Sequence, residues 1–453
     1  MYHDRTFAQV DREIARCIES YSDEFWASTD RNPRDGVHGY FRYPAMMVPA
    51  ILRELIRALC RVQPSISNVV DPFLGAGTTM TASMGLGLNF AGQDINPLAV
   101  LISRAKAGPY FHRALQDKAD RALEAINSDK GEQVEVSFDG IDKWFPADTQ
   151  VELSRIRRAV QGERALWTRR FLWVALGETV RLTSNTRTST YKLHTRPRNE
   201  IESRRLSALG TFSDVLRRNL DDLVAFRDAL GEAGQLRRGH YAGQVSVHLA
   251  DSARAAVPCT RGAKGFELLV TSPPYGDNTS TVPYGQHSYL PLQWVDLADI
   301  DARAAKGDWL RSTQEIDRRS LGGKTPQDVD DAIRRLCGSS QSFAATVRAL
   351  RKKPGDRLRR VVAYTSAMST ALDPILDALR PNAYMIWIVG NRHVGGVEIP
   401  TSDMLVELME GHGARLVTCA TRSIAFRRMA ARNSISTAIR KEHVLVFRKV
   451  CES

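Results

Sequence analysis

The stretch Asp71-Pro72-Phe73-Leu74-Gly75-Ala76-Gly77-Thr78-Thr79 decides the fold that we expect for this chain. It follows an apolar, β-branched run at 66–70 and opens into residues 80–84, which have the composition of a helix. A strand, a glycine turn and a helix form the first unit of a nucleotide-binding α/β sheet. The glycines let the backbone approach a ligand at the amino end of the helix. Met80 stands where a dinucleotide fingerprint has its third glycine, which argues against a pyrophosphate cofactor.

An acidic residue follows the second expected strand. Residues 88–93 read as that strand, and Asp94 comes directly after it. A carboxylate at this strand tip is typical of a ribose-binding site. The alternative is that Asp94 caps the helix expected after Asn96-Pro97. The sequence favours ligand binding over capping.

A second motif lies roughly 200 residues downstream, where the apolar run 266–270 ends in Thr271-Ser272-Pro273-Pro274-Tyr275. The two prolines fix φ and donate no N–H, so the backbone carbonyls beside the Ser272 hydroxyl act as acceptors. Acceptors next to the flat ring of Tyr275 fit the exocyclic amino group of a flipped nucleobase. Taken alone, the pentapeptide reads more simply as a strand that ends in a Pro-Pro turn. The upstream motif in the same chain favours the nucleobase.

Together the two motifs resemble those of the S-adenosylmethionine-dependent amino-methyltransferases of DNA. The resemblance implies a Rossmann-like class I methyltransferase sheet with a closing antiparallel hairpin, plus a mainly helical insert. Within that family, Ser-Pro-Pro-Tyr is typical of N4-cytosine enzymes, and Asp- or Asn-Pro-Pro-Tyr is more typical of N6-adenine enzymes. The resemblance assigns catalysis to Ser272, Pro273, Pro274 and Tyr275.

Further segments resemble the family's cofactor site, with S-adenosyl-L-methionine as the implied cofactor. Residues 40–45 resemble the segment that packs on the methionine part of the cofactor, and Asp251 resembles the acidic strand tip near the adenine. The residues expected to bind the cofactor are Phe41, Pro44, Asp71, Phe73, Gly75, Gly77, Thr78, Asp94 and Asp251. No cluster of ligand-type side chains predicts a metal site.

The motif positions divide the chain into five expected parts. Residues 1–107 hold an N-terminal segment and the first half of the core, 241–299 hold the catalytic strand tip, and 359–453 hold the second half of the core. Two inserts interrupt this core. The insert at 108–240 has apolar spacing of helical period and is expected to carry target recognition, and a basic insert spans 300–358. In the first insert, residues 184–198 are rich in Ser, Thr and Arg, which are common phosphate partners, and Tyr191 and His194 are candidates for base stacking.

Composition agrees with a DNA partner. The formal net charge is +12 and the pI is about 9.5, which favours a polyanion. No run of 18 apolar residues predicts a membrane span, and the N-terminus lacks a signal-peptide core. Six cysteines without paired spacing read as reduced thiols, so we expect a cytoplasmic protein.

The resulting hypothesis is a site-specific N4-cytosine DNA methyltransferase in a restriction-modification or phage-defence context. Its expected partners are DNA and a restriction endonuclease or another defence-system subunit, and no membrane. Three alternatives stay open at this point: an N6-adenine DNA methyltransferase, an RNA methyltransferase, and a catalytically inactive DNA-binding subunit.

Overall fold

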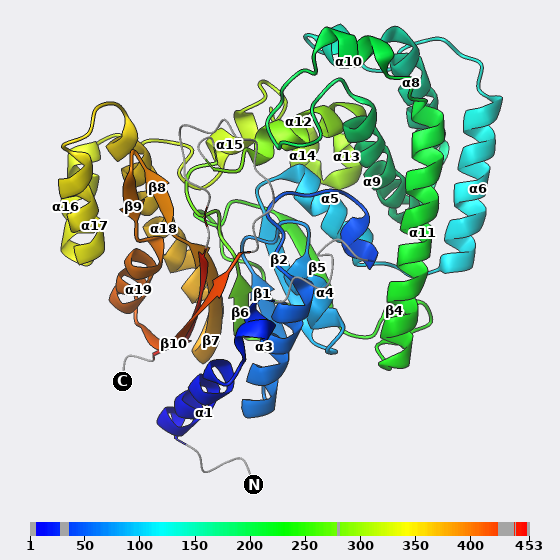
Figure 1. Ribbon diagram of the computed structural model, residues 1–453. Coiled ribbons are helices and arrows are strands. Elements are labelled where there is room, and N and C mark those ends of the chain that lie inside the picture. Colours follow the sequence, from blue (N-terminus) through cyan, green and yellow to red (C-terminus); the bar gives the residue numbers. More distant parts are fainter. Residues whose placement is uncertain (1–5, 28–35, 279–280, 425–438, 440, 451–453) are drawn as a thin grey trace.

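A computed structural model describes residues 6–27, 36–278, 281–424, 439 and 441–450. Its centre is a seven-stranded sheet with the strand order β10-β11-β7-β6-β1-β2-β5 (Figure 1). The strands are β1 (Asn68–Asp71), β2 (Asn89–Asp94), β5 (Val245–Leu249), β6 (Phe266–Thr271), β7 (Leu379–Gly390), β10 (Ala414–Ser423) and β11 (Lys441–Lys449). Two short hairpins lie outside this sheet: β3 (Leu236–Arg237) with β4 (His240–Tyr241), and β8 (Arg392–Val394) with β9 (Val397–Ile399).

Five strands of the sheet are parallel and two close it. The pairs β5–β2, β2–β1, β1–β6 and β6–β7 are parallel, whereas β11 runs antiparallel to both β7 and β10. The expected α/β class and its closing antiparallel hairpin are therefore confirmed. The chain enters the sheet at β1 and continues to β2 and β5 on one side of that strand. It then returns to β6, which lies on the other side of β1. Such a reversal marks the sheet edge where α/β proteins bind ligands, at the carboxyl ends of β1 and β6.

Both faces of the sheet are buried, as the near-continuous apolar runs of parallel strands require. Side chains alternate between two hydrophobic clusters because successive residues of a strand point to opposite faces. Val69, Val270 and Ile386 belong to one cluster, and Val70, Leu269 and Trp387 belong to the other. Full burial of one aliphatic side chain stabilises a fold by roughly 1.5–3 kcal/mol, so these alternating residues fix which face each strand presents.

Helices from distant parts of the chain cover these faces. The N-terminal half supplies α1 (Phe7–Glu19), α2 (Asp23–Trp26), η1 (Gly36–Gly39), α3 (Pro49–Val62), α4 (Thr78–Met84) and α5 (Pro97–Lys106). The first insert supplies α6 (His112–Ser128), α7 (Ile141–Trp144), α8 (Ala147–Gly162), α9 (Leu166–Thr183), α10 (Arg198–Ser203) and α11 (Ala208–Glu232). Apolar residues of α9 and α11 lie in the same hydrophobic cluster as Val69, so the insert packs against the core.

The remaining helices fall into two groups: α12 to α15 lie above the sheet in Figure 1, and α16 to α19 lie at its left. They are α12 (Tyr284–Trp294), α13 (Leu297–Ile300), α14 (Ala302–Lys306), α15 (Glu315–Arg319), α16 (Val329–Ser339), α17 (Gln341–Leu350), α18 (Arg357–Asp377) and α19 (Thr401–Gly411). Side chains of α16 to α19 pack in the second cluster with Val70. Within the described ranges, no helix combines the length and apolar composition that a membrane crossing needs.

Two stretches outside the motifs also have helical patterns in the sequence. The amphipathic spacing over 7–30 predicts helical structure, which the structure divides in two: α1 ends at Glu19, and Ser22 caps a separate α2 by accepting from the Phe25 N–H. Residues 28–30 lie outside the described part. The sequence of 361–379 also predicts a helix up to Leu379, but α18 ends at Asp377 and Leu379 begins β7, where it pairs with Phe266 of β6.

Candidate active site

The two sequence motifs meet at one edge of the sheet. Because β1 and β6 are adjacent and parallel, their carboxyl-terminal tips lie side by side. The Thr271 hydroxyl donates to Oδ1 of Asp71 at 2.6 Å, and the Phe73 N–H donates to the same oxygen at 3.0 Å. Asp71 is fully buried, and this burial raises its pKa to about 6. Asp71 therefore ties the glycine loop to the Ser-Pro-Pro-Tyr tip.

The glycine loop is supported from below by α5. Gly75 and Gly77 have φ values of 51° and 79°, which disfavour other residues. A Cβ on Gly77 would lie 2.9 Å from the Ser103 hydroxyl, which itself donates to the Gly75 carbonyl at 3.1 Å. The buried amine of Lys106 donates to the Ala76 carbonyl at 2.7 Å, and burial lowers its pKa to about 7. No sequence pattern predicted that Ser103 and Lys106 would support the glycine loop.

Asp94 faces the same loop from the tip of β2. Its two carboxylate oxygens accept from the Gly75 N–H and the Asn96 N–H, each at 2.8 Å. Burial raises its pKa to about 6 despite these hydrogen bonds. The cap of α5 is Asn96, whose side chain accepts from the Leu98 N–H at 3.0 Å. Asp94 lines a cavity instead of capping that helix.

That cavity is partly open to solvent and runs from the glycine loop to the Ser-Pro-Pro-Tyr tip. Eight of the sequence-predicted residues line it: Pro44, Phe73, Gly75, Thr78, Asp94, Asp251, Ser272 and Pro274. Phe41, Asp71, Gly77, Pro273 and Tyr275 are not among its lining residues. Phe41 is buried against His287, with ring centroids 5.7 Å apart.

The chemistry of the lining fits a nucleoside. Carboxylates at Asp94 and Asp251 are acceptors for hydroxyl and amino groups, and Phe73, Ile95 and Leu321 add apolar surface. Tyr43 and Tyr284 form a paired aromatic wall, with ring centroids 5.8 Å apart. Among the described residues, no group of histidine, cysteine or carboxylate side chains is arranged to hold a metal ion.

Tyr275 lies in the middle of a directed chain of hydrogen bonds that runs from Ser272 to Glu442. Its phenol donates to Oε1 of Glu442 at 2.9 Å, so its only proton is committed to that carboxylate. The Ser272 hydroxyl must then donate to the phenol oxygen, at 3.2 Å. Since a hydroxyl has one proton and two lone pairs, Ser272 keeps only acceptor capacity for a ligand. Burial and the charge of Glu442 raise the pKa of Tyr275 well above its usual range, so the phenol stays protonated.

Strand register explains how Glu442 reaches Tyr275. Glu442 pairs with Arg422 on one side and with Gly390 on the other. A Cβ on Gly390 would lie 2.8 Å from Cδ2 of Tyr275, so the missing side chain makes room for the ring. Arg422 lies 3.2 Å from the second oxygen of Glu442 and holds the carboxylate from behind.

The loop after Tyr275 is more firmly held than its turn-rich sequence predicts. Asp277 forms a buried ion pair with Arg392 at 3.2 Å. The Tyr364 hydroxyl donates to the Pro274 carbonyl at 2.7 Å, so that carbonyl already has a donor. The turn-rich sequence of 276–285 predicts a mobile loop over the pocket; the ion pair of Asp277 anchors its first part, and residues 279–280 lie outside the described part.

Comparison with known proteins shows that this chain is similar to DNA methyltransferases. The family model for N6/N4 DNA methylases matches residues 15–104, which contain the glycine loop and Asp94. Type II methyltransferase M.MvaI of Kocuria varians is 28% identical over 441 residues, which cover 95% of this chain and 93% of that protein. Type II methyltransferase M.BsoBI of Geobacillus stearothermophilus is 26% identical over 129 residues, 28% of this chain and 25% of that protein. The solved structure of the rRNA methyltransferase aviRa of Streptomyces viridochromogenes aligns with 95% of this chain and 94% of its own chain at 10% identity, with a TM-score of 0.29.

Proposed function

Because the chain belongs to the N6/N4 DNA methyltransferase family, we propose that it transfers a methyl group from S-adenosyl-L-methionine to N4 of a cytosine in a specific DNA sequence. The observation that carries the proposal is that the glycine loop, Ser272 and Pro274 line one and the same cavity. A donor site and an acceptor site that share one cavity hold two reactants in line, which removes much of the entropic cost of their encounter.

The cavity residues fit this cofactor. Asp94 would accept hydrogen bonds from the ribose hydroxyls and Asp251 from the adenine side, with Phe73 and Ile95 as apolar neighbours of the ring. Pro44 and Met46 would contact the methionine part. When bound, the cofactor supplies a methyl group on a positively charged sulfur. The chain's own residues have to position the nucleophile.

The nucleophile is a weak one, because the lone pair of a cytosine amino group is conjugated into the ring. Ser272 presents only lone pairs, since its proton is donated to Tyr275. Ser272 would therefore accept one amino proton. The Pro273 carbonyl is the proposed acceptor of the other, since the neighbouring Pro274 carbonyl already accepts from Tyr364. Two acceptors on the amino group favour a pyramidal nitrogen whose lone pair points at the methyl group. A stacked base on the Tyr275 ring contributes roughly 1–3 kcal/mol.

Cytosine is favoured over adenine by the serine of the tetrapeptide. The names of the two type II relatives support a site-specific enzyme, and we propose a restriction-modification or phage-defence context for it. DNA is then the substrate, and a separate restriction endonuclease or another defence subunit is the proposed partner.

The test is methylation of unmodified DNA by the purified chain, with sequencing and nucleoside analysis of the product. N4-methylcytosine in one sequence context, absent with Tyr275→Ala, is the expected result. N6-methyladenine would keep the reaction and overturn the base assignment. Methyl transfer only to RNA, or no transfer together with no thermal shift by S-adenosylhomocysteine, would overturn the proposed function.

A further inference from the structure

A second hollow lies beside the catalytic cavity, where the end of α9 and the loop after it meet Arg42 and α12. Its lining includes four positively charged side chains, Arg42, Arg181, Arg187 and Lys192, and no carboxylate. Five further lining side chains carry a hydroxyl group, among them Thr188 and Thr190. This lining is rich in hydrogen-bond donors and poor in charged acceptors.

Several of the donors lack an acceptor within the described chain. The buried Nε of Arg42 has no hydrogen-bond partner there. The hydroxyls of Thr188 and Thr190 each accept a hydrogen bond, from the Arg196 side chain and the Lys192 N–H, which leaves their own protons to donate. A buried donor such as Nε of Arg42 costs free energy when it stays unpaired, and the two threonine hydroxyls add donors beside it, so this hollow favours an oxyanion.

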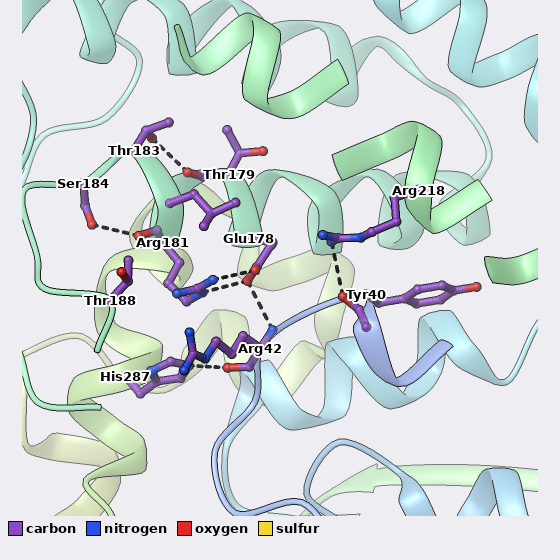
Figure 2. A network of polar contacts seen from close by, with 12 residues as sticks. Tyr40, Arg42, Glu178, Thr179, Arg181, Thr183, Ser184, Thr188, Arg218 and His287 are labelled. Carbon is purple, nitrogen blue, oxygen red and sulfur yellow. Dashed lines mark hydrogen bonds and ion pairs between the residues drawn. The ribbon is translucent and has the colours of Figure 1, made fainter. Parts of the chain in front are cut away.

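One carboxylate below the hollow holds the arginines in place without filling it. Figure 2 shows Glu178 between Arg181 and the backbone of Arg42. Both oxygens of Glu178 accept from the guanidinium of Arg181, at 2.6 and 2.8 Å, and one also accepts from the Arg42 N–H at 3.2 Å. Glu178 thus offsets one positive charge, and the guanidinium of Arg42 is left for a ligand.

The loop is fixed against the catalytic core. The Leu193 N–H donates to Oε1 of Gln286 at 3.1 Å, and the ring of Tyr191 meets that of His287 edge-on at 5.4 Å. His287 contacts the carbonyl of Arg42 at 2.9 Å. The hollow is therefore a preformed part of the fold that joins the first insert to α12.

Its position relates it to the catalytic cavity. Arg42 precedes Tyr43 in the chain, and His287 follows Tyr284 by three residues in α12, which places the two side chains on one side of the helix. Tyr43 and Tyr284 both line the catalytic cavity. We propose that this hollow binds one backbone phosphate of the DNA strand that carries the target base. The inference rests on the proposed function, because it takes DNA as the substrate. Guanidinium and hydroxyl groups that converge on one point are the usual partners of a phosphodiester and hold the duplex in register.

The first test is the salt dependence of DNA binding by Arg42→Gln, Arg187→Gln and the double variant. Loss of one phosphate contact lowers the slope of log Kobs against log salt concentration by about 0.9 in magnitude. Both single variants should weaken binding about tenfold, as expected for a charge-assisted hydrogen bond. Because both arginines face one phosphate, the double variant should lower the slope by about one contact in total, not two. Arg53→Gln, an exposed arginine on α3, is the matched control and should leave the slope unchanged.

The second test uses duplexes in which one phosphate at a time is a neutral methylphosphonate. One replacement near the target base should weaken binding by the unsubstituted chain and have no further effect on Arg42→Gln. The inference would be overturned if all variants had the same salt slope, or if Arg42→Gln and Arg187→Gln removed the effect of replacing two different phosphates. In either case, DNA methylation by the unsubstituted chain would still support the proposed function. An unchanged thermal shift with S-adenosylhomocysteine shows that the variants are folded. No DNA binding by the unsubstituted chain would overturn both proposals.

Discussion

The hydroxyl of Thr271 donates to Oδ1 of Asp71 at 2.6 Å, and this bond joins two motifs that lie 200 residues apart in the chain. Neither residue lines the catalytic cavity. Their contact instead fixes how far the glycine loop lies from the Ser-Pro-Pro-Tyr tip. The distance between the two substrates of the proposed reaction is thus set by a buried pair beneath them.

Replacing Thr271 by Val removes this hydrogen bond and leaves a buried carboxylate oxygen with one donor fewer. We expect the free energy of unfolding to fall by about 1–3 kcal/mol, the usual cost of an unsatisfied buried group. The loss should be larger at pH 8 than at pH 5, because the hydroxyl stabilises the ionised form of Asp71, whose pKa is about 6. Urea unfolding at both pH values measures it. Thr370→Val on the exposed side of α18 is the control, and an equal loss there would contradict the assignment.

Glu442 is predicted to act on turnover through Tyr275. Glu442→Ala removes the acceptor that orients the phenol, so the Ser272 proton is no longer directed away from the amino group. We expect kcat to fall about 10–100-fold, corresponding to the loss of a hydrogen bond to a charged group. The affinity for S-adenosylhomocysteine should not change, because Glu442 does not line the cavity.

The conservative variant separates orientation from structural damage. Glu442→Gln keeps an oxygen that accepts from the phenol, so its kcat should lie between those of the unsubstituted chain and the Ala variant. Glu410→Gln, an exposed carboxylate on α19, is the control. If Gln and Ala lowered kcat equally, or if both raised KM alone, Glu442 would not act by orienting Tyr275.

Much of this site is predictable from sequence because its parts are local. A strand, a glycine turn and a Pro-Pro tip can each be recognised from a few consecutive residues. Parallel strands then bring their carboxyl ends to one edge of the sheet. Glu442 has no such signal. It reaches Tyr275 only because β11 pairs with β7 in a register that sets it beside Gly390. Lys106 was missed for a related reason, since a lysine near a helix end is ordinarily solvated.

Asp94 predicts a pH dependence of cofactor binding. Burial raises its pKa to about 6, so the carboxylate is present above that pH and is lost as pH falls through it. A ribose diol donates to the ionised form. We therefore expect the Kd of S-adenosylhomocysteine to rise as pH falls below about 6, approaching tenfold per pH unit. Calorimetric titration between about pH 5 and pH 7.5 measures this.

The control for Asp94 is Asp94→Asn, which should bind more weakly and show a flatter profile. Asp71 and Asp317 also have pKa values near 6 and remain in this variant, so the difference between the two profiles isolates Asp94. An identical slope in both proteins would show that another group controls binding. The same raised pKa has the opposite effect on the free energy of unfolding. Because the folded chain holds this proton more tightly than the unfolded chain, the fold becomes less stable as pH rises from about 4 to 6.

Lys106 provides the last test, on stability. Burial lowers its pKa from an ordinary 10.5 to about 7, and its amine donates to the Ala76 carbonyl. Between these values the unfolded chain binds a proton that the folded chain does not, so stability falls as pH drops from about 10 to 7 and then levels off. Lys106→Met removes the amine, so neither the folded nor the unfolded chain binds this proton. The pH slope of the unfolding free energy should therefore be smaller by about 1.4 kcal/mol per pH unit in the variant. Other groups that titrate in this range, such as Cys60, cancel in the comparison. Equal slopes would mean that Lys106 stays charged in the fold, and that its ammonium group, not a neutral amine, holds the glycine loop.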